Sequence, residues 1–332
     1  MGAAMSEAGH FLAAALNTAI DTVALRWDSR AIAKGELPDD LLAMKPQVLI
    51  YLLPRVFQSL NDPMASFFSS LWLFGTGKFG DIKKNDNLPR TPYYWRFKIA
   101  DFSNSETLKS VTKSVLDKSL DLLPQMGTVD AAHDERWKKL RALASRARVA
   151  HKGDDEWTES TPDYRSVMIT PDVLLETRQI DTATYLANGE SPLKSDAYAA
   201  MGPCAVRSYF WADIKKRSGD EKTYVRPKRV GIRIWDDYNF RDDDWISNLG
   251  GLSGIASQFL GVWANSADGS YIVLQNSDFN AFREKFMHRY NEFLDSRRSG
   301  KPRLVCHDFS SFSDYMEVDV ASTIEYPLLG LS

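Results

Sequence analysis

The stretch Val230-Gly231-Ile232-Arg233-Ile234-Trp235-Asp236-Asp237-Tyr238-Asn239-Phe240 carries the clearest structural signal in this chain. Its apolar residues alternate with Arg233 and Trp235, and a period of two is typical of a β-strand with one buried face. The strand then runs directly into two aspartates and two aromatic residues. We therefore expect a half-buried strand whose acidic end is a candidate position for a functional site.

Segments on both sides of this stretch predict further strands joined by short turns. Residues 205–213 and 223–235 are rich in β-branched and aromatic residues, and Ser218-Gly219-Asp220 between them indicates a hairpin turn. Shorter strands are expected at 164–170, 259–263, 271–274, 304–309 and 315–320. Short turns between neighbouring strands favour a mixed, mostly antiparallel sheet.

Helices are expected in the remaining parts of the chain. Ser277 has the position of an N-cap before an aromatic stripe at helical spacing, and 172–189 is interpreted as helical or irregular. The apolar segment 41–60 contains two prolines, so we expect it to be kinked. In the first 150 residues, apolar positions recur with a helical period at 11–25, 105–123 and 134–150.

A polar stretch at 151–156 separates the helical first part of the chain from the strand-rich second part. It marks the expected domain boundary. The sequence thus predicts an α+β protein with two parts. Residues 1–150 form a helical N-terminal region, and residues 151–332 form a mixed, mostly antiparallel sheet domain with flanking helices. A chain of 332 residues that is 44% hydrophobic can bury a substantial core. The net charge of −3, from 41 basic and 44 acidic residues, gives no basic excess, so no nucleic-acid partner is expected.

Metal and cofactor motifs are weak in this sequence. The five histidines are scattered and form no pair with zinc-ligand spacing, and Cys204 and Cys306 are expected to be buried free thiols. Gly75-Thr76-Gly77-Lys78-Phe79-Gly80 matches the glycine pattern of a phosphate-binding loop, but a loop rather than a helix is expected after it. A Lys-bearing surface loop is the commoner explanation, and no cofactor is predicted.

Four aspartates are the candidate catalytic residues. Asp236 and Asp237 lie at the end of the expected strand, Asp278 at the start of a helix and Asp308 near the end of another strand. If Asp236, Asp278 and Asp308 reach the same rim, their carboxylates would suit metal-assisted hydrolysis or general acid–base catalysis. Asp236 and Asp237 are equally compatible with turn-forming residues that cap the strand. The residues leave open whether a metal binds and whether the protein is an enzyme.

The tripeptide Cys306-His307-Asp308 brings together three residue types that are common in active sites. On a strand, successive side chains point to opposite faces, so Cys306 and Asp308 would share one side and His307 would lie on the other. A nucleophile and base would therefore need partners from elsewhere in the chain. A buried cysteine in a strand is the commoner explanation.

Several segments of the second half form a recognisable set: Leu174-Leu175, Met201-Gly202-Pro203-Cys204-Ala205-Val206-Arg207, the 230–240 stretch, Leu249-Gly250, and Gln275-Asn276-Ser277-Asp278-Phe279 with Arg283. The set resembles a family of uncharacterised bacterial proteins that are often encoded beside type VI secretion genes of the VgrG and PAAR kind. The resemblance covers roughly residues 160–320. The family continues into a short glycine-rich turn before its final strand, whereas 286–301 is longer and more helical here.

This resemblance implies a setting, interbacterial secretion, and not a chemistry. The first hypothesis is an effector, an antibacterial toxin made in the bacterial cytoplasm and secreted without a cleaved signal peptide. Residues 1–150 would contact a VgrG or PAAR carrier, a chaperone or a membrane, residues 151–332 would carry the activity, and a cognate immunity protein would be a partner. The second hypothesis is a non-enzymatic adaptor or immunity-type binding protein. The third is membrane disruption by the apolar 47–74 region.

Overall fold

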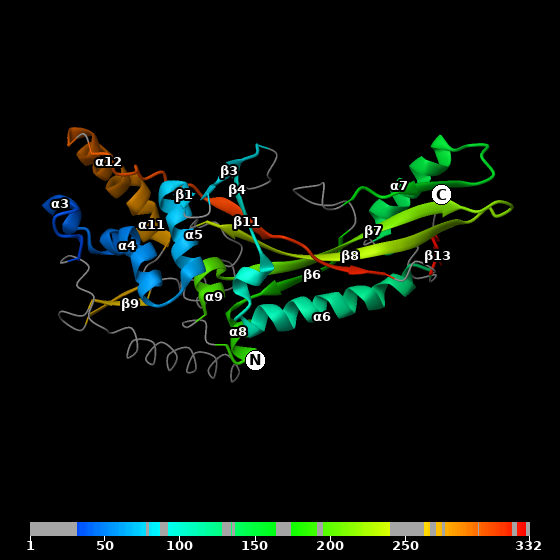
Figure 1. Ribbon diagram of the computed structural model, residues 1–332, viewed down its shortest axis with the longest axis horizontal. Coiled ribbons are helices and arrows are strands. Elements are labelled where there is room, and N and C mark those ends of the chain that lie inside the picture. The colour runs from blue at the N-terminus through cyan, green and yellow to red at the C-terminus, as the bar shows by residue number, and fades with distance from the viewer. Residues whose placement is uncertain are drawn as a thin grey trace.

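The computed structural model describes residues 32–77, 80–86, 92–127, 134, 137–163, 174–190, 195–239, 262–265, 270–273, 276–297, 299–320 and 324–329. The molecule is elongated, with helices gathered at one end and a long twisted sheet that leads to the other (Figure 1). Helices flank a mixed sheet, so the predicted α+β class is confirmed.

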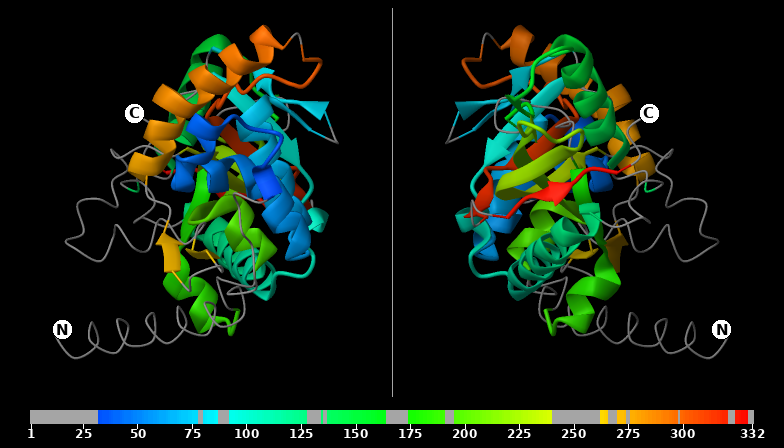
Figure 2. Two further views of the ribbon diagram at one scale, coloured as in Figure 1. Left: turned by 90° about the vertical axis from the view of Figure 1, so that its left-hand side faces the viewer. Right: turned by 90° about the vertical axis from the view of Figure 1, so that its right-hand side faces the viewer.

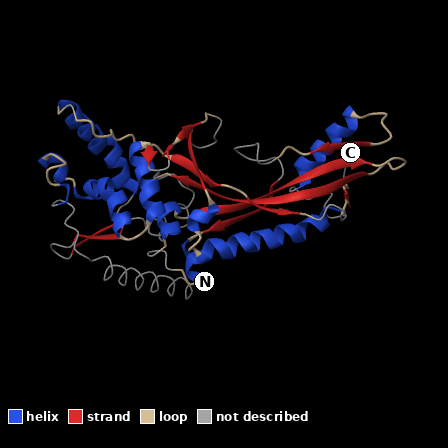
Figure 3. Ribbon diagram, viewed as in Figure 1, coloured by secondary structure: helices blue, strands red, loops and turns tan. Residues whose placement is uncertain are grey.

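The centre of the sheet is the long hairpin of β7 (Cys204–Lys216) and β8 (Thr223–Tyr238), and it confirms the predicted hairpin (Figure 3). β8 pairs antiparallel with three later strands, β11 (Phe309–Ser313), β12 (Met316–Asp319) and β13 (Tyr326–Pro327). β11 in turn runs parallel to a strand from the first third of the chain, β4 (Tyr93–Phe97), which makes the sheet mixed.

Shorter strands complete the described sheets. β3 (Lys83–Lys84) pairs with β4, and β5 (Trp157–Ser160) and β6 (Leu174–Ile180) pair with β7. Two small separate hairpins are formed by β1 (Thr76–Gly77) with β2 (Gly80–Asp81), and by β9 (Val262–Asn265) with β10 (Ser270–Val273).

The helix α6 (Glu106–Leu122) lies along one face of the sheet, against β6, β7 and β8 (Figure 1). Ser105 caps this helix because its side chain accepts a hydrogen bond from the Leu108 N–H. The Ser119 hydroxyl of α6 lies 2.6 Å from that of Ser208 on β7, which fixes the helix to the sheet. We call the face covered by α6 the inner face and the opposite one the outer face.

A second group of helices builds the helical end of the molecule (Figure 2). α4 (Lys45–Ser59) and α5 (Pro63–Phe74) pack against each other, and α4 contacts α11 (Asn276–Ala281) from far along the chain. α11 continues through one π-helical turn, η8 (Phe282–Phe286), into α12 (Met287–Ser296). The remaining described helices are α3 (Asp39–Leu42), η1 (Ile99–Phe102), η2 (Leu123–Gly127), α7 (Lys138–Ala150), α8 (Thr182–Ala187) and α9 (Asp196–Met201).

One large hydrophobic core joins residues from both sides of the expected boundary at 150/151. Phe68 of α5 contacts the rings of four aromatic residues: Phe97, Phe102, Tyr238 and Phe309. β3 and β4, from the first 150 residues, also belong to the same sheet as β8. The two parts of the chain therefore share a core, and their division into a contacting and an active region stays a prediction.

Two sequence expectations are wrong, and others lie outside the described residues. The strand expected at 304–309 begins only at Phe309, because Cys306 has a left-handed φ of 49° and the N–H groups of 305–307 bond to the last carbonyls of α5. The helical or irregular interpretation of 172–189 is wrong for β6, whose pairing with β7 overrides a weak local preference, but the helix α8 (Thr182–Ala187) confirms it for the later part. The helix expected at 11–25 and the strand at 164–170 are not described.

Candidate functional site

The acidic end of β8 places its two aspartates on opposite faces of the sheet. Asp236 lies opposite Ser311 on β11, and Asp237 lies opposite Ser310. Because side chains alternate along a strand, Asp236 shares the inner face with Ile234. Asp237 is therefore on the outer face, and the two carboxylates cannot act on the same group.

On the inner face, Asp236 is buried, with 7% of its surface exposed. It lies close enough to Cys204, Tyr185 and Tyr238 to raise the pKa of each, although burial is the larger cause in all three. The thiol and both phenols are thus held in their protonated forms. Cys204 consequently lacks the thiolate that a nucleophile requires.

Asp308 is buried in an ion pair and is not part of an open rim. Its Oδ1 accepts hydrogen bonds from the Trp72 indole N–H, at 3.0 Å, and from Arg283. The Arg283 guanidinium also lies over the Trp72 ring, 5.1 Å from its centroid. Asp308 therefore fixes the π-helical turn η8 against α5 and the segment that precedes β11.

Asp278 lies in the first turn of α11 and is half-buried. Its backbone carbonyl accepts a hydrogen bond of 3.4 Å from the Gln47 side chain of α4. Within the described residues, no group of three or more His, Cys, Asp or Glu side chains is placed to hold a metal ion. Asp236, Asp278 and Asp308 accordingly do not form the three-carboxylate centre considered from the sequence.

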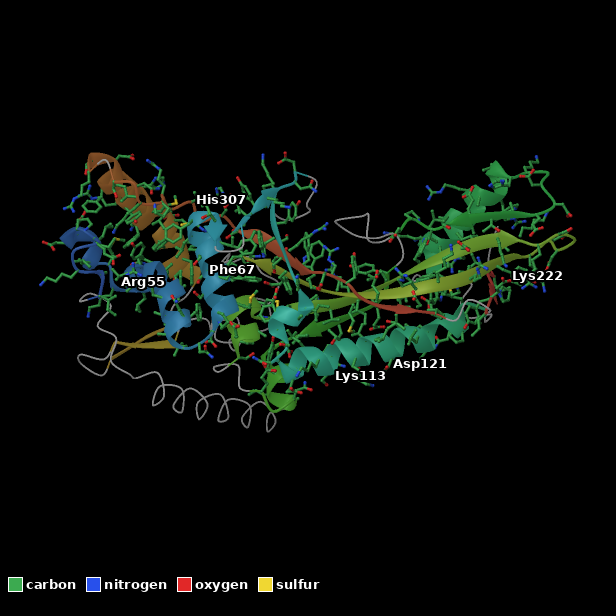
Figure 4. The ribbon with its side chains drawn as sticks, viewed as in Figure 1. Arg55, Phe67, Lys113, Asp121, Lys222 and His307 are labelled. Atoms are coloured by element: carbon green, nitrogen blue, oxygen red, sulfur yellow. The ribbon has the colours of Figure 1, made fainter. Side chains whose placement is uncertain are left out.

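The tripeptide at 306–308 does not form a nucleophile–base pair. Cys306 is buried, and this burial raises the pKa of its thiol to about 12. His307 lies where α5 meets the segment before β11 and stacks on Tyr93, with ring centroids 4.2 Å apart (Figure 4). Burial lowers the pKa of the His307 imidazole. Both cysteines are free and buried, as predicted.

The glycine motif sits at the wrong end of a helix for a phosphate loop. Gly75 ends α5 with a left-handed φ of 69°, and an added Cβ would meet the Val305 side chain at 3.2 Å. The motif then forms the β1–β2 hairpin. A phosphate-binding loop precedes a helix N-terminus, where N–H groups point at the ligand, whereas here the loop follows a C-terminus.

The outer face carries a cluster of arginines and aromatic residues that sequence reasoning missed. Arg207 of β7 lies directly opposite Arg233 of β8. The guanidinium carbons of Arg207 and Arg233 lie 4.8 Å and 5.4 Å from the centroid of the same ring, Trp235. Arg233 also covers Phe312 of β11 at 4.1 Å, and Phe312 lies opposite Arg96 of β4. We call Arg96, Arg207, Arg233, Trp235 and Phe312 the arginine–aromatic cluster.

Hydrogen bonds hold this cluster in place. Arg233 is only 2% exposed and donates from Nη1 to the Tyr315 hydroxyl at 2.9 Å. Burial lowers the pKa of the Arg233 guanidinium, and the positive charge of Arg96 acts in the same direction. Asp237 borders the cluster, and its Oδ1 accepts a hydrogen bond of 2.7 Å from the Ser310 hydroxyl.

One signal for this cluster was present in the sequence. The alternation that predicts β8 puts Arg233, Trp235 and Asp237 on one face. Arg96, Arg207 and Phe312 come from other strands. Alternation within one strand does not reveal which strands pair with it.

Comparisons with protein families, with curated proteins and with solved structures find no match to this chain. A separate search of the described helices finds none that is both long and apolar enough to cross a membrane.

Proposed function

We propose that this chain is an effector of a type VI secretion system, an antibacterial toxin that engages its target through the outer face at the acidic end of β8. The resemblance carried by 201–207, 230–240 and 275–283 supports the secretion setting. One observation carries the proposed position: residues from β4, β7, β8 and β11 gather charged and aromatic side chains on this single face. Such a face suits both an enzyme and a binding toxin.

Asp237 on the outer face is favoured over the other predicted aspartates because a ligand can reach it. Asp236 and Asp308 are buried, and Asp308 is engaged by Trp72 and Arg283. Asp237 is half-buried beside the arginine–aromatic cluster, where a ligand on that face would approach it. Among the four candidates, Asp237 is therefore the one we assign to the target-binding face.

The rest of the proposal follows the same setting. Residues 1–150 would contact a VgrG or PAAR carrier or a chaperone, and a cognate immunity protein would neutralise the toxin. The protein would be made in the bacterial cytoplasm and then secreted. The rival of membrane disruption by the 47–74 region requires α4 and α5 to leave the core, where Val48, Leu52 and Phe68 are fully buried.

Growth of bacteria that express the full chain tests the effector proposal. We expect growth inhibition when the chain is expressed in the cytoplasm or exported to the periplasm, because a toxin acts in the compartment of its target. The changes Arg207→Gln and Asp237→Asn should relieve this inhibition. Asp121→Asn, an exposed change on α6, is the matched control and should leave it unchanged (Figure 4).

Full growth in both compartments would overturn the effector proposal and favour an adaptor or immunity-type protein. Undiminished inhibition by folded Arg207→Gln and Asp237→Asn proteins would remove the outer face from the proposal. Dye release from liposomes by the purified chain would instead favour membrane disruption. Circular dichroism of each variant separates loss of function from loss of fold.

A further inference from the structure

We propose that the arginine–aromatic cluster is a binding site for a phosphate group. The site is on the proposed target-binding face, but the inference rests on the cluster itself and not on secretion. Arg207 and Arg96 supply the ligand contacts, and Arg233 supplies a fixed buried charge beneath them.

Like charges lie next to one another in this cluster. Arg207 and Arg233 are directly opposed on neighbouring strands, an arrangement that destabilises a sheet when nothing compensates it. Arg96 lies close enough to Arg233 to lower the pKa of its guanidinium. Three guanidinium groups from three strands thus share one patch, which the Asp237 carboxylate borders, and their combined positive charge attracts an anion.

The charges of Arg96 and Arg207 are available to a ligand. Neither Arg96 nor Arg207 makes an ion pair with any residue that the structure describes. Arg207 instead lies over the ring of Trp235, with its guanidinium carbon 4.8 Å from the ring centroid. Arg229, on the same face of β8, is different: its guanidinium pairs with Asp319 at 2.7 Å and Glu317 at 3.4 Å. β8 therefore carries Arg229, whose charge is paired with carboxylates, and lies beside Arg207, whose guanidinium is stacked on an aromatic ring.

The buried guanidinium of Arg233 is preorganised by its neighbours. The Arg233 guanidinium contacts the rings of Phe312 and Trp235 and donates a hydrogen bond to the Tyr315 hydroxyl. Tyr94 stacks on Phe312 with centroids 5.6 Å apart and supports the ring from β4. The positive charge of Arg233 is therefore in place before an anion arrives, so no binding energy is spent on ordering this side chain.

Accessibility divides the roles of the three arginines. Arg96 is exposed and Arg207 is partly exposed, so both can donate hydrogen bonds to a ligand. Arg233 is buried and acts through its charge. A phosphate group carries close to two negative charges and three acceptor oxygens, which fits several guanidinium groups better than a carboxylate with one charge and two oxygens.

Calorimetric titration of the full chain with inorganic phosphate at constant ionic strength tests this site. We expect saturable binding that Arg207→Gln or Arg96→Gln weakens by at least about tenfold, which corresponds to about 1.4 kcal/mol. Arg229→Gln should bind phosphate as the unchanged protein does, because that charge is already paired. The indole N–H signal of Trp235, assigned in the NMR spectrum with Trp235→Phe, should shift with phosphate.

Three results would overturn the phosphate site: no binding to the unchanged protein, equal binding of acetate, or unweakened binding by both Arg96→Gln and Arg207→Gln. Arg96→Gln keeps the test decisive if Arg207→Gln fails to fold, because Arg96 is exposed. Phosphate binding without growth inhibition would overturn only the effector proposal. Growth inhibition without phosphate binding would overturn only this one.

Discussion

At the scale of single residues, the four aspartates identified from sequence have four different environments. Asp236 is buried beside a thiol and phenols, Asp237 borders the arginine–aromatic cluster, Asp278 begins a helix and Asp308 is in a buried ion pair. The residue type was the same in each case. Burial and partners decide what each carboxylate can do, and neither is written in the local sequence.

A fifth aspartate, Asp62, gives a prediction about pH. It precedes α5 and is 8% exposed, and burial raises the pKa of its carboxyl to about 6, with the nearby Asp196 carboxylate as the second cause. Asp196 itself caps α5 by accepting from the N–H groups of Met64 and Ala65 at 3.1 and 2.8 Å. Two carboxyl groups are thus held together at one helix end.

Because the folded-state pKa of Asp62 lies above its unfolded value, the folded protein binds the extra proton between pH 4 and 6. The free energy of unfolding should therefore fall as pH rises through this window. Asp62→Asn should make the unfolding free energy depend less on pH. It should stabilise the protein at pH 7 by up to roughly 3 kcal/mol, the limit set by a pKa shift from 3.8 to about 6. Urea unfolding at several pH values measures this. Parallel curves for the variant and the unchanged protein would contradict the assignment.

At the scale of elements, the residues before β11 illustrate how one helix end shapes its neighbour. The N–H groups of Val305 and His307 bond to Leu73 and Trp72 carbonyls at the end of α5, at 2.8 and 3.1 Å. A strand at 304–308 would leave those carbonyls without these donors. The helix end thus competes with the sheet for this segment, and the left-handed φ of Cys306 marks the point where the chain turns.

The Asp308–Arg283 pair should be the strongest polar link among these elements. Asp308→Asn keeps the size of the side chain but leaves the guanidinium of Arg283 without its charge partner. Removing one member of a buried pair costs about 3–5 kcal/mol, so we expect a loss of this order in unfolding free energy. Arg303→Gln, which breaks an exposed pair with Asp295, should cost under about 1 kcal/mol. Equal losses of unfolding free energy in the two variants would show that the buried pair stabilises the protein no more than the exposed pair does.

At the scale of the whole molecule, the shared core argues against two separately folding halves. Phe68 lies in the first 150 residues, yet its ring contacts Tyr238 and Phe309 in the second part of the chain. The parallel pairing of β4 with β11 joins residues more than 200 positions apart in the same way. We infer that the described parts unfold together.

Calorimetry with Phe68→Ala tests this inference. Removing a fully buried phenylalanine costs about 3–5 kcal/mol. Because the core is common to both parts, the whole heat-absorption peak should move to lower temperature. Leu140→Ala, in the separate cluster beneath α7 at the far end of the hairpin, is the informative comparison. Two peaks, of which only one moves with Phe68→Ala, would establish independent units.

Elements with a local signal could be predicted from the amino-acid sequence. The alternation at 230–238 specified β8, the turn at Ser218-Gly219-Asp220 specified the β7–β8 hairpin, and helical spacing specified α6. A period of two or 3.6 arises from backbone geometry within a few residues, so one chain segment suffices to reveal it.

Long-range packing determines which strands pair and which side chains become neighbours. Arg96, Arg207 and Phe312 become neighbours of Arg233 through pairings over long sequence separations, and Asp308 meets Arg283 because α5 and η8 pack on the same segment. Such pairings depend on the burial of complete faces of the sheet against the helices, a property of the whole chain and not of any segment. The sequence therefore predicted the acidic end of β8 as a candidate position for a site. It did not predict the arginine–aromatic cluster on the outer face.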